Sequence, residues 1–136
     1  MDALIRPATE ADIPRITGMV ERLAKAINGP QAVDPIWTGQ RVAFLIHSPD
    51  GFVRVSERGF IAACLTRTII SPELVANEEG WWAEDRSFIP LFRSFEAWAD
   101  GRSVRLRKMS CATDPVRRFL EREGYRLAEL AMVKVN

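Results

Sequence analysis

The sequence predicts one α/β domain in which helices cover both faces of a mixed β-sheet. At 136 residues the chain has the size of a single domain, so we expect residues 1–136 to form one unit. Hydrophobic residues make up 47% of it, which is enough for a core. Patterns of helical and strand period follow one another in the order β-α-α-β-β-β-α-β-α-β-β. The early hairpin implies antiparallel pairing, and the later alternation of helices and strands implies parallel pairing.

A short strand and a helix begin the chain. The strand is predicted at residues 3–6. Thr9 is the expected N-cap of the helix, and Asp12 takes the place of the acid in a capping box. Pro14 lies just beyond the first turn, so we expect an irregular start. The Asn-Gly-Pro run at residues 28–30 ends the helix.

A second helix and a hairpin follow. The pair at residues 34–35, Asp-Pro, provides an N-cap and a first-turn proline for this helix. The Ser-Pro-Asp-Gly run at residues 48–51 is a turn by composition. Residues 52–55 and 60–68 are typical of two paired strands, joined by a turn near residues 57–59.

The most informative stretch is a strand that runs straight into a helix. The strand is the aromatic-rich segment 80–83, and the helix has Ser87 as N-cap, Pro90 in its first turn and Gly101 at the C′ position. Apolar residues of helical spacing form one stripe, namely Phe88, Leu91, Phe92, Phe95, Trp98 and Ala99. The unpaired N–H groups at such a helix start favour an anionic ligand, so we expect a binding site at this junction.

The last third of the chain contains a strand, a helix and two short strands. Residues 103–109 alternate between apolar and basic side chains, as a half-buried strand does. The Asp-Pro pair at residues 114–115 begins a helix, and Gly124 ends it. Residues 125–127 and 130–135 are predicted to close the chain as strands.

Composition and charge narrow the class of protein. No apolar run reaches the roughly 18 residues of a membrane span, and no apolar signal core begins the chain. We expect Cys64 and Cys111 to be buried free thiols of a cytoplasmic protein without a metal site. Residues 73–100 carry seven acids and two arginines, and residues 102–126 carry eight bases and three acids. This segregation is either ordinary solvated surface or the two sides of a site for an anionic and a cationic ligand.

Three phrases, in this order, resemble the GNAT superfamily of acyl-CoA N-acyltransferases. They are IRPATEADIP at residues 5–14, FEAWA at residues 95–99 and FLEREGYR at residues 119–126. The resemblance covers nearly the whole chain and implies a GNAT-like fold. It implies that acetyl-CoA lies where the fourth strand splays from the fifth, with its pyrophosphate at the following helix start. The residues that would contact it are Trp82, Ala83, Arg86, Ser87, Phe88, Cys111 and Thr113.

The sequence also departs from the pattern of the family it resembles. That family's phosphate loop carries glycines after its basic residue, whereas Arg86 is followed by Ser-Phe-Ile-Pro. Leu120 stands where a general-acid tyrosine is frequent, and Thr113 where an asparagine is frequent. Two functions therefore stay open. One is acetyl transfer from acetyl-CoA to a primary amine, and the other is a GNAT-fold binding or assembly module without catalysis.

Amine acetylation needs a base and a donor to the thioester oxygen. The carboxylates nearest the predicted site are Glu78, Glu79 and Glu84. We select Glu79 and Glu84 as candidate catalytic bases; the alternative is that each is a solvated strand-edge charge. The N–H of Ala83 or a neighbour is the expected oxyanion donor. Cys111 or Tyr125 is the expected proton donor to the leaving thiolate.

The expected partner is a small-molecule or protein amine, and the acidic segment suggests a cationic one. In the family that the chain resembles, residues corresponding to 29–34 and the last two strands shape the acceptor pocket. No nucleic-acid partner is expected, because the basic charge is modest and lacks interleaved aromatic residues. No membrane partner is expected, and self-association through a sheet edge would give a homodimer.

Overall fold

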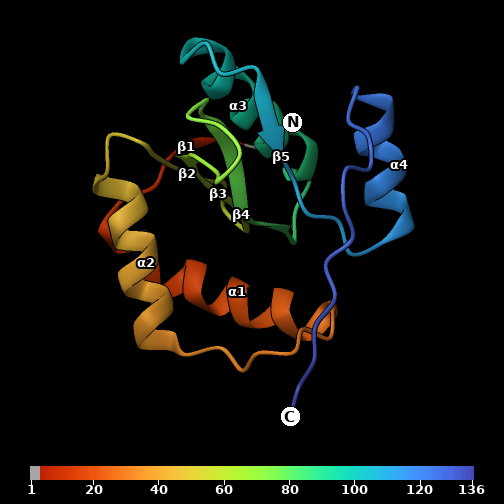
Figure 1. Cartoon of the computed structure of the whole chain (residues 1–136). Helices are drawn as coiled ribbons and strands as arrows, with labels where there is room; N and C mark the ends of the chain where they lie inside the picture. The colour runs from red at the N-terminus through yellow and green to blue at the C-terminus, as the bar shows by residue number, and fades with distance from the viewer. Residues whose placement is uncertain (1–3) are drawn as a thin grey trace.

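The computed structural model describes residues 4–136, which form a five-stranded sheet with helices on both faces (Figure 1). The strands lie in sequence order across the sheet: β1 (Arg6–Pro7), β2 (Gly51–Val55), β3 (Gly59–Thr66), β4 (Val75–Ala83) and β5 (Leu106–Lys108). The helical elements are the 3₁₀ turn η1 (Glu10–Asp12), α1 (Ile13–Ala26), α2 (Pro35–His47), α3 (Phe88–Gly101) and α4 (Asp114–Arg122). The predicted α/β class is confirmed.

The pairing directions also match the prediction. Strands β1 to β4 pair antiparallel in turn, and β5 pairs parallel with β4. Strand β4 is longer than predicted, because the polar run at residues 77–79 lies inside it. Asn77 pairs with Cys64 of β3, and Glu78 pairs with Ala63. The polar run therefore does not end the strand, because its backbone continues the ladder with β3.

Two apolar clusters fill the space between the sheet and its helices. Helices α1 and α2 cover one face, and α3 covers the other (Figure 1). The first cluster is built from Ala8, Ile16, Met19, Val42, Leu45, Val53, Val55, Phe60 and Ala62. The second is built from Phe52, Ile61, Ala63, Leu65, Ala76, Trp81, Leu91, Phe92, Phe95, Ala99, Val104 and Leu120. Helices thus cover both faces, as the sequence predicts.

The predicted helix starts are confirmed. The Thr9 N–H donates to the Asp12 carboxylate (2.9 Å), which completes the capping box, and Arg6 and Arg15 also donate to this carboxylate. The irregular opening predicted near residue 14 is the 3₁₀ turn η1. Asp34 caps α2, because its carboxylate accepts two backbone N–H groups at 3.0 Å each. None of the helices described here is long and apolar enough to cross a membrane.

Two strand predictions at the chain's beginning and middle need correction. The first strand comprises Arg6–Pro7 rather than residues 3–6, and residue 3 itself lies outside the described residues. The predicted strand at residues 103–109 comprises only Leu106–Lys108. The reason is that the chain is still leaving α3: Ser103 has a positive φ of 57°, which turns the following residue back into the core.

The predicted ends of α3 and of the chain are also wrong. Gly101 belongs to α3 and does not form its C′ turn. Residues 125–136 form no strand. Side-chain contacts hold this segment instead: the Tyr125 hydroxyl donates to Glu96 on α3 (2.8 Å), and Lys108 at the end of β5 pairs with Glu129 (2.8 Å). With only three residues, β5 offers a short edge for a further ladder.

Candidate functional site

Strands β4 and β5 separate where their short parallel ladder ends. Residues 75–77 of β4 pair with residues 106–108, after which β5 stops and β4 continues to Ala83. The N–H of Glu84 donates to the carbonyl of Arg58 on the β3 side (2.8 Å). Because successive N–H groups alternate between the two edges of a strand, the N–H of Ala83 points to the opposite edge, which β5 has left. We call this region the β4–β5 divergence.

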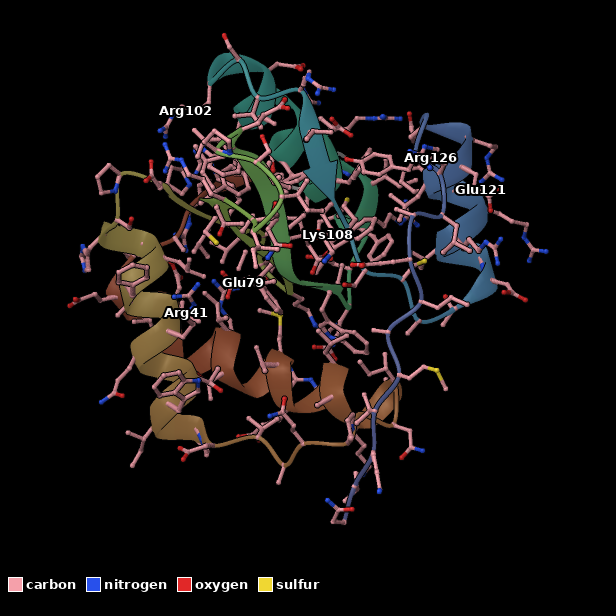
Figure 2. The ribbon with its side chains drawn as sticks, in the orientation of Figure 1. Arg41, Glu79, Arg102, Lys108, Glu121 and Arg126 are labelled. Carbon is pink, nitrogen blue, oxygen red and sulfur yellow. The ribbon has the colours of Figure 1, made fainter. Side chains whose placement is uncertain are left out.

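The two adjacent glutamates of β4 lie at a β-bulge and face opposite sides of the sheet. The register between β3 and β4 shifts at Ala62 and Ala63, so that Glu79 has no partner on β3. Glu78 pairs with Ala63, whose side chain packs on the α3 side, and therefore shares that side. Glu79 reaches the other side, where Arg41 of α2 meets it (Figure 2). Adjacent strand residues point to opposite faces, and the bulge in addition leaves Glu79 without a cross-strand neighbour, so that Arg41 can reach it.

The three carboxylates have different electrostatic surroundings. Arg41 donates twice to Glu79, at 2.9 and 2.6 Å, and Arg22 of α1 donates twice to Glu84, at 3.0 and 2.7 Å. Burial alone would raise the pKa of Glu79, but the bonds from Arg41 outweigh it and the pKa lies below its ordinary value. The bonds from Arg22 likewise lower the pKa of Glu84.

Glu78 is the exception among these carboxylates. It has no arginine partner in the described part of the chain, and its one protein donor is the backbone N–H of Ser110, just beyond β5, at 3.0 Å. Burial raises the pKa of Glu78 to about 7. A carboxyl group with such a pKa, at the β4–β5 divergence, is suited to accept and release a proton near neutral pH. Sequence analysis named Glu78 together with the two selected glutamates. It could not distinguish their pKa values, because the arginines that bind Glu79 and Glu84 come from helices far away in the sequence.

The start of α3 carries its own anion. The Asp85 carboxylate accepts hydrogen bonds from the Ser87 N–H (3.0 Å), the Arg58 N–H (2.9 Å) and the Ser56 hydroxyl (2.9 Å), and also from the Ser87 hydroxyl. Burial would raise the pKa of Asp85, but these bonds outweigh it and lower the pKa. The helix start therefore already holds a negative charge in contact with its first N–H group.

The two serines and a glycine fit this carboxylate closely. Ser56 and Ser87 are buried, and their hydroxyl oxygens lie 2.7 Å apart. A Cβ on Gly59 would lie 2.6 Å from the Ser87 oxygen and 2.8 Å from that of Ser56. Only glycine leaves room for the pair at this position. The cluster links the β2–β3 turn to the start of α3.

Arg86 and Phe88 flank this cluster. Arg86 is exposed and forms no ion pair within residues 4–136. The Phe88 ring stacks on Trp81 with a centroid distance of 3.8 Å, and the Trp81 indole N–H donates to the Phe88 carbonyl (2.9 Å). The Phe88 side chain therefore belongs to the core, and only its backbone N–H can face a ligand. Pro90 supplies no N–H.

The remaining predicted contact residues lie around the divergence without forming one cluster. Trp82 packs in the cluster beneath α1, on the opposite face from Trp81, and its buried indole nitrogen has no hydrogen-bond partner in the described structure. Cys111 is exposed, which corrects the prediction of a buried thiol. Thr113 is the N-cap of α4. Tyr125, the alternative proton donor, is bound to Glu96 instead.

The charge segregation of the sequence disappears in three dimensions. Five of the seven acids in residues 73–100 form ion pairs with arginines that lie outside this segment. The pairs are Glu73–Arg105, Glu79–Arg41, Glu84–Arg22, Glu96–Arg107 and Asp100–Arg107. The segment therefore gives no acidic surface from which a cationic acceptor could be argued.

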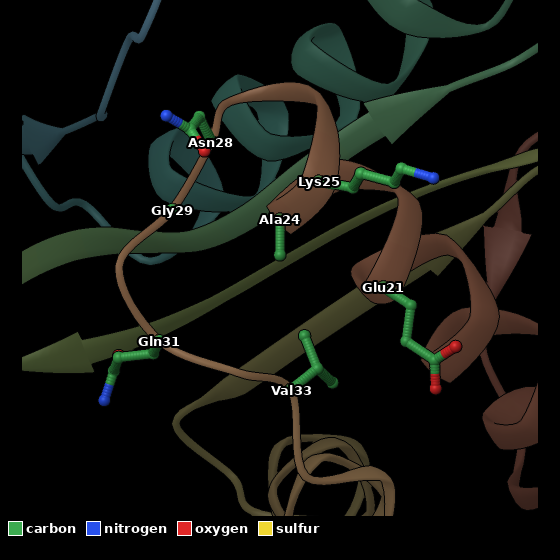
Figure 3. A pocket seen from close by; sticks show the side chains of 7 residues that line it. All are labelled: Glu21, Ala24, Lys25, Asn28, Gly29, Gln31 and Val33. Atoms are coloured by element: carbon green, nitrogen blue, oxygen red, sulfur yellow. The ribbon is translucent and has the colours of Figure 1, made fainter.

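A hollow of about 380 Å³ lies at the C-terminal end of α1 (Figure 3). Its lining residues are Glu21, Ala24, Lys25, Asn28, Gly29, Gln31 and Val33. Four of them belong to the connection between α1 and α2, which includes the segment expected to shape an acceptor pocket. The hollow is open, its lining is polar and apolar in about equal measure, and none of its lining residues belongs to the β4–β5 divergence.

Comparison with known proteins gives a fold. No family model and no curated protein sequence matches the chain. Among solved structures it resembles a GCN5-related N-acetyltransferase from Ralstonia eutropha JMP134, with a TM-score of 0.75 and 12% identity over 98% of this chain and 99% of that one. It also resembles a variant of the BH1408 protein from Bacillus halodurans, with a TM-score of 0.78 and 14% identity over 98% of this chain and 99% of that one. A third similar structure is a possible acetyltransferase from Clostridium difficile 630, with a TM-score of 0.72 and 14% identity over 99% of this chain and 98% of that one.

The chain has the GNAT fold. The likeness extends over almost the full length of each chain, which agrees with the resemblance of the three sequence phrases. Identities of 12–14% establish the architecture and leave the chemistry to be argued from residues. Within this GNAT fold, sequence reasoning missed one feature that the Asp-x-Ser spacing could have signalled. The short side chain of Asp85 caps a helix start two residues ahead.

Proposed function

We propose that this protein transfers an acetyl group from acetyl-CoA to a primary amine. The observation that carries the proposal is the β4–β5 divergence of a GNAT fold, with Glu78 beside it and the Ala83 N–H directed into it. The sequence-selected bases Glu79 and Glu84 are bound by arginines, and this moves our choice of base to Glu78.

The reaction converts an amine and a thioester into an amide and a thiol. Glu78 accepts a proton from the amine, for which a pKa of about 7 is well suited. The N–H of Ala83 donates to the thioester oxygen as negative charge develops on it. The carbon–sulfur bond breaks, and the thiolate takes up a proton. Exposed Cys111 stands near this region as a candidate donor.

The site is better suited to the pantetheine arm of acetyl-CoA than to its pyrophosphate. The free edge of β4 offers backbone groups to the pantetheine arm. The pyrophosphate would meet Arg86 and the N–H groups of Phe88 and Ile89, which donate to no protein acceptor within the described residues. Asp85 occupies the Ser87 N–H and adds a negative charge nearby. We therefore expect weak binding of the phosphates.

A titration of the protein with acetyl-CoA, followed by thermal unfolding, tests binding. Ligand at 100 times its Kd stabilises the native state by about 2.7 kcal/mol, which corresponds to a shift of roughly 10 °C for a domain of this size. Turnover is then measured as CoA release with a panel of primary amines. Glu78→Gln should keep the thermal shift and lower kcat, whereas the matched Glu79→Gln variant should retain kcat. Equal turnover in the wild type and Glu78→Gln would remove Glu78 from the mechanism.

The alternative is a GNAT-fold binding or assembly module without catalysis. The specific observation in its favour is Asp85, which occupies the Ser87 N–H and places a negative charge at the helix start where the phosphates would bind. Under this alternative, millimolar acetyl-CoA produces no thermal shift in the wild type. That result would refute the acetyltransferase proposal.

A further inference from the structure

Helix α2 is apolar on both sides, although only one side faces the protein. Val42 and Leu45 are buried against the sheet. On the opposite side, Ile36, Trp37 and Phe44 are 75%, 66% and 57% exposed. Figure 1 shows α2 at the outside of the molecule, with α1 and the sheet on its inner side. A helix that is apolar all round is normally covered all round, so the outer side of α2 lacks a partner.

The outer side of α2 forms one continuous stripe. At 100° per residue, Ile36, Trp37, Gln40, Phe44 and His47 fall within an arc of about 100°. The stripe contains no carboxylate and no lysine. Its polar members are the Gln40 amide, at the centre, and His47, at the end. We refer to these five residues as the α2 stripe.

The one charged side chain inside α2 is engaged within its own chain. Arg41 donates to Glu79 at 2.9 and 2.6 Å, and its guanidinium lies 5.1 Å from the centroid of the Phe44 ring (Figure 2). It therefore neutralises an acid of β4. A further charge, the exposed Glu10 carboxylate, lies 2.9 Å from the His47 ring at the end of the stripe. Because the centre of the stripe carries no charge, two such surfaces can approach each other there without electrostatic repulsion.

We propose that the α2 stripe is the contact surface of a homodimer, in which two copies of α2 pack antiparallel about a twofold axis at Gln40. Trp37 lies three residues before Gln40 and Phe44 four residues after it. In an antiparallel pair, Trp37 of each copy therefore meets Phe44 of the other, and the two Gln40 amides face each other. A contact of this kind is self-complementary, as a twofold interface requires.

The exposed area agrees with a weak dimer. An aromatic side chain presents about 150–250 Å², so Ile36, Trp37 and Phe44 together expose roughly 400 Å² per copy. Two copies bury roughly 800 Å², and Gln40, His47 and their flanks bring the total near the roughly 1,000 Å² of a specific interface. The stripe begins three residues after Val33 of the hollow, so a second copy would stand beside the hollow.

Sedimentation equilibrium of the whole chain over about 1–500 µM tests the proposal, with a micromolar Kd expected. Trp37→Glu should raise the dimer Kd at least about thirty-fold, as expected for a central aromatic contact. Ile69→Glu, which changes a fully exposed apolar residue on the β3–β4 loop, should leave Kd unchanged.

A pair of opposite charges introduced at the twofold axis shows whether a loss of the dimer is caused by the contact itself or by a folding defect of the variant. Gln40→Glu alone and Gln40→Lys alone each place like charges across the axis and should be monomeric. An equimolar mixture of the two variants should restore the dimer. A monomeric wild type throughout the range, a dimer that survives Trp37→Glu, or a mixture that stays monomeric would each overturn the proposal.

Discussion

Replacing Asp85 by asparagine should weaken the fold and strengthen acetyl-CoA binding at the same time. Asp85 accepts four hydrogen bonds, two from backbone N–H groups and two from serine hydroxyls. Asparagine keeps the shape of the side chain but loses its negative charge. Its NH₂ group cannot accept a hydrogen bond, so some of the four donors around residue 85 lose their acceptor. Hydrogen bonds to a charged group contribute about 1.5–3 kcal/mol, and a charge at a helix start adds about 0.3–1 kcal/mol.

The expected loss is therefore about 2–4 kcal/mol, or roughly 10 °C in Tm at about 3–5 °C per kcal/mol. Thermal unfolding followed by circular dichroism measures it. The folded-state pKa of Asp85 is lowered, so its contribution is present at neutral pH and is lost as the pH falls through that pKa. The difference between wild type and Asp85→Asn should accordingly shrink below about pH 4.

The matched control is Asp50→Asn. Asp50 accepts one bond from Arg102 (3.0 Å), and both side chains are largely exposed, so its replacement should cost less than about 1 kcal/mol. In the same titrations, acetyl-CoA should bind Asp85→Asn more tightly than wild type, because a negative charge near the phosphates is gone. An Asp85→Asn protein with unchanged Tm and unchanged affinity would refute this account of the α3 start.

Three further predictions concern stability. Gly59→Ala should lower the free energy of unfolding in urea by about 1–3 kcal/mol, because its Cβ would lie 2.6 Å from the Ser87 oxygen; no loss would mean that the serine pair can move aside. Asp12→Asn should lower stability at pH 7 by about 2–3 kcal/mol, and the difference from wild type should vanish in acid because the pKa of Asp12 is lowered by its arginine partners. Tyr125→Phe should cost about 1 kcal/mol through the lost bond to Glu96, and an equal or higher Tm would show that this bond does not hold the C-terminal segment.

The parts of the fold that the sequence predicted are those determined by neighbouring residues. The Asp34-Pro35 pair begins α2, and the turn near residues 57–59 joins two paired strands, because cap and turn chemistry acts over two to four residues. The order and direction of strands β2 to β5 follow from these local units. The last two strands were predicted on the same basis. These two predictions were wrong because a strand also needs a neighbouring edge to pair with, and β5 provides only three residues.

The site was harder to predict because its properties depend on partners far along the chain. Glu79 and Glu84 differ from Glu78 through Arg41 and Arg22, which are 38 and 62 residues away in sequence. No local pattern could have revealed which carboxylate remains without an arginine. Arg41 and Arg22, together with Arg105 and Arg107, also pair with most of the acids in residues 73–100.

The short ladder between β4 and β5 has a consequence for local unfolding. Strand β4 pairs with β3 through eight residue pairs but with β5 through three. Besides this ladder, the chain beyond α3 is held by Val104 and Leu120 in the core and by exposed or half-exposed polar contacts, such as the Glu73–Arg105 and Arg93–Glu123 ion pairs and the bond from Tyr125. Amide hydrogens of residues 106–125 should therefore exchange through openings that leave β3 and β4 intact. If the exchange experiment gives this result, one side of the β4–β5 divergence is fixed by its long ladder, and the other side opens more readily.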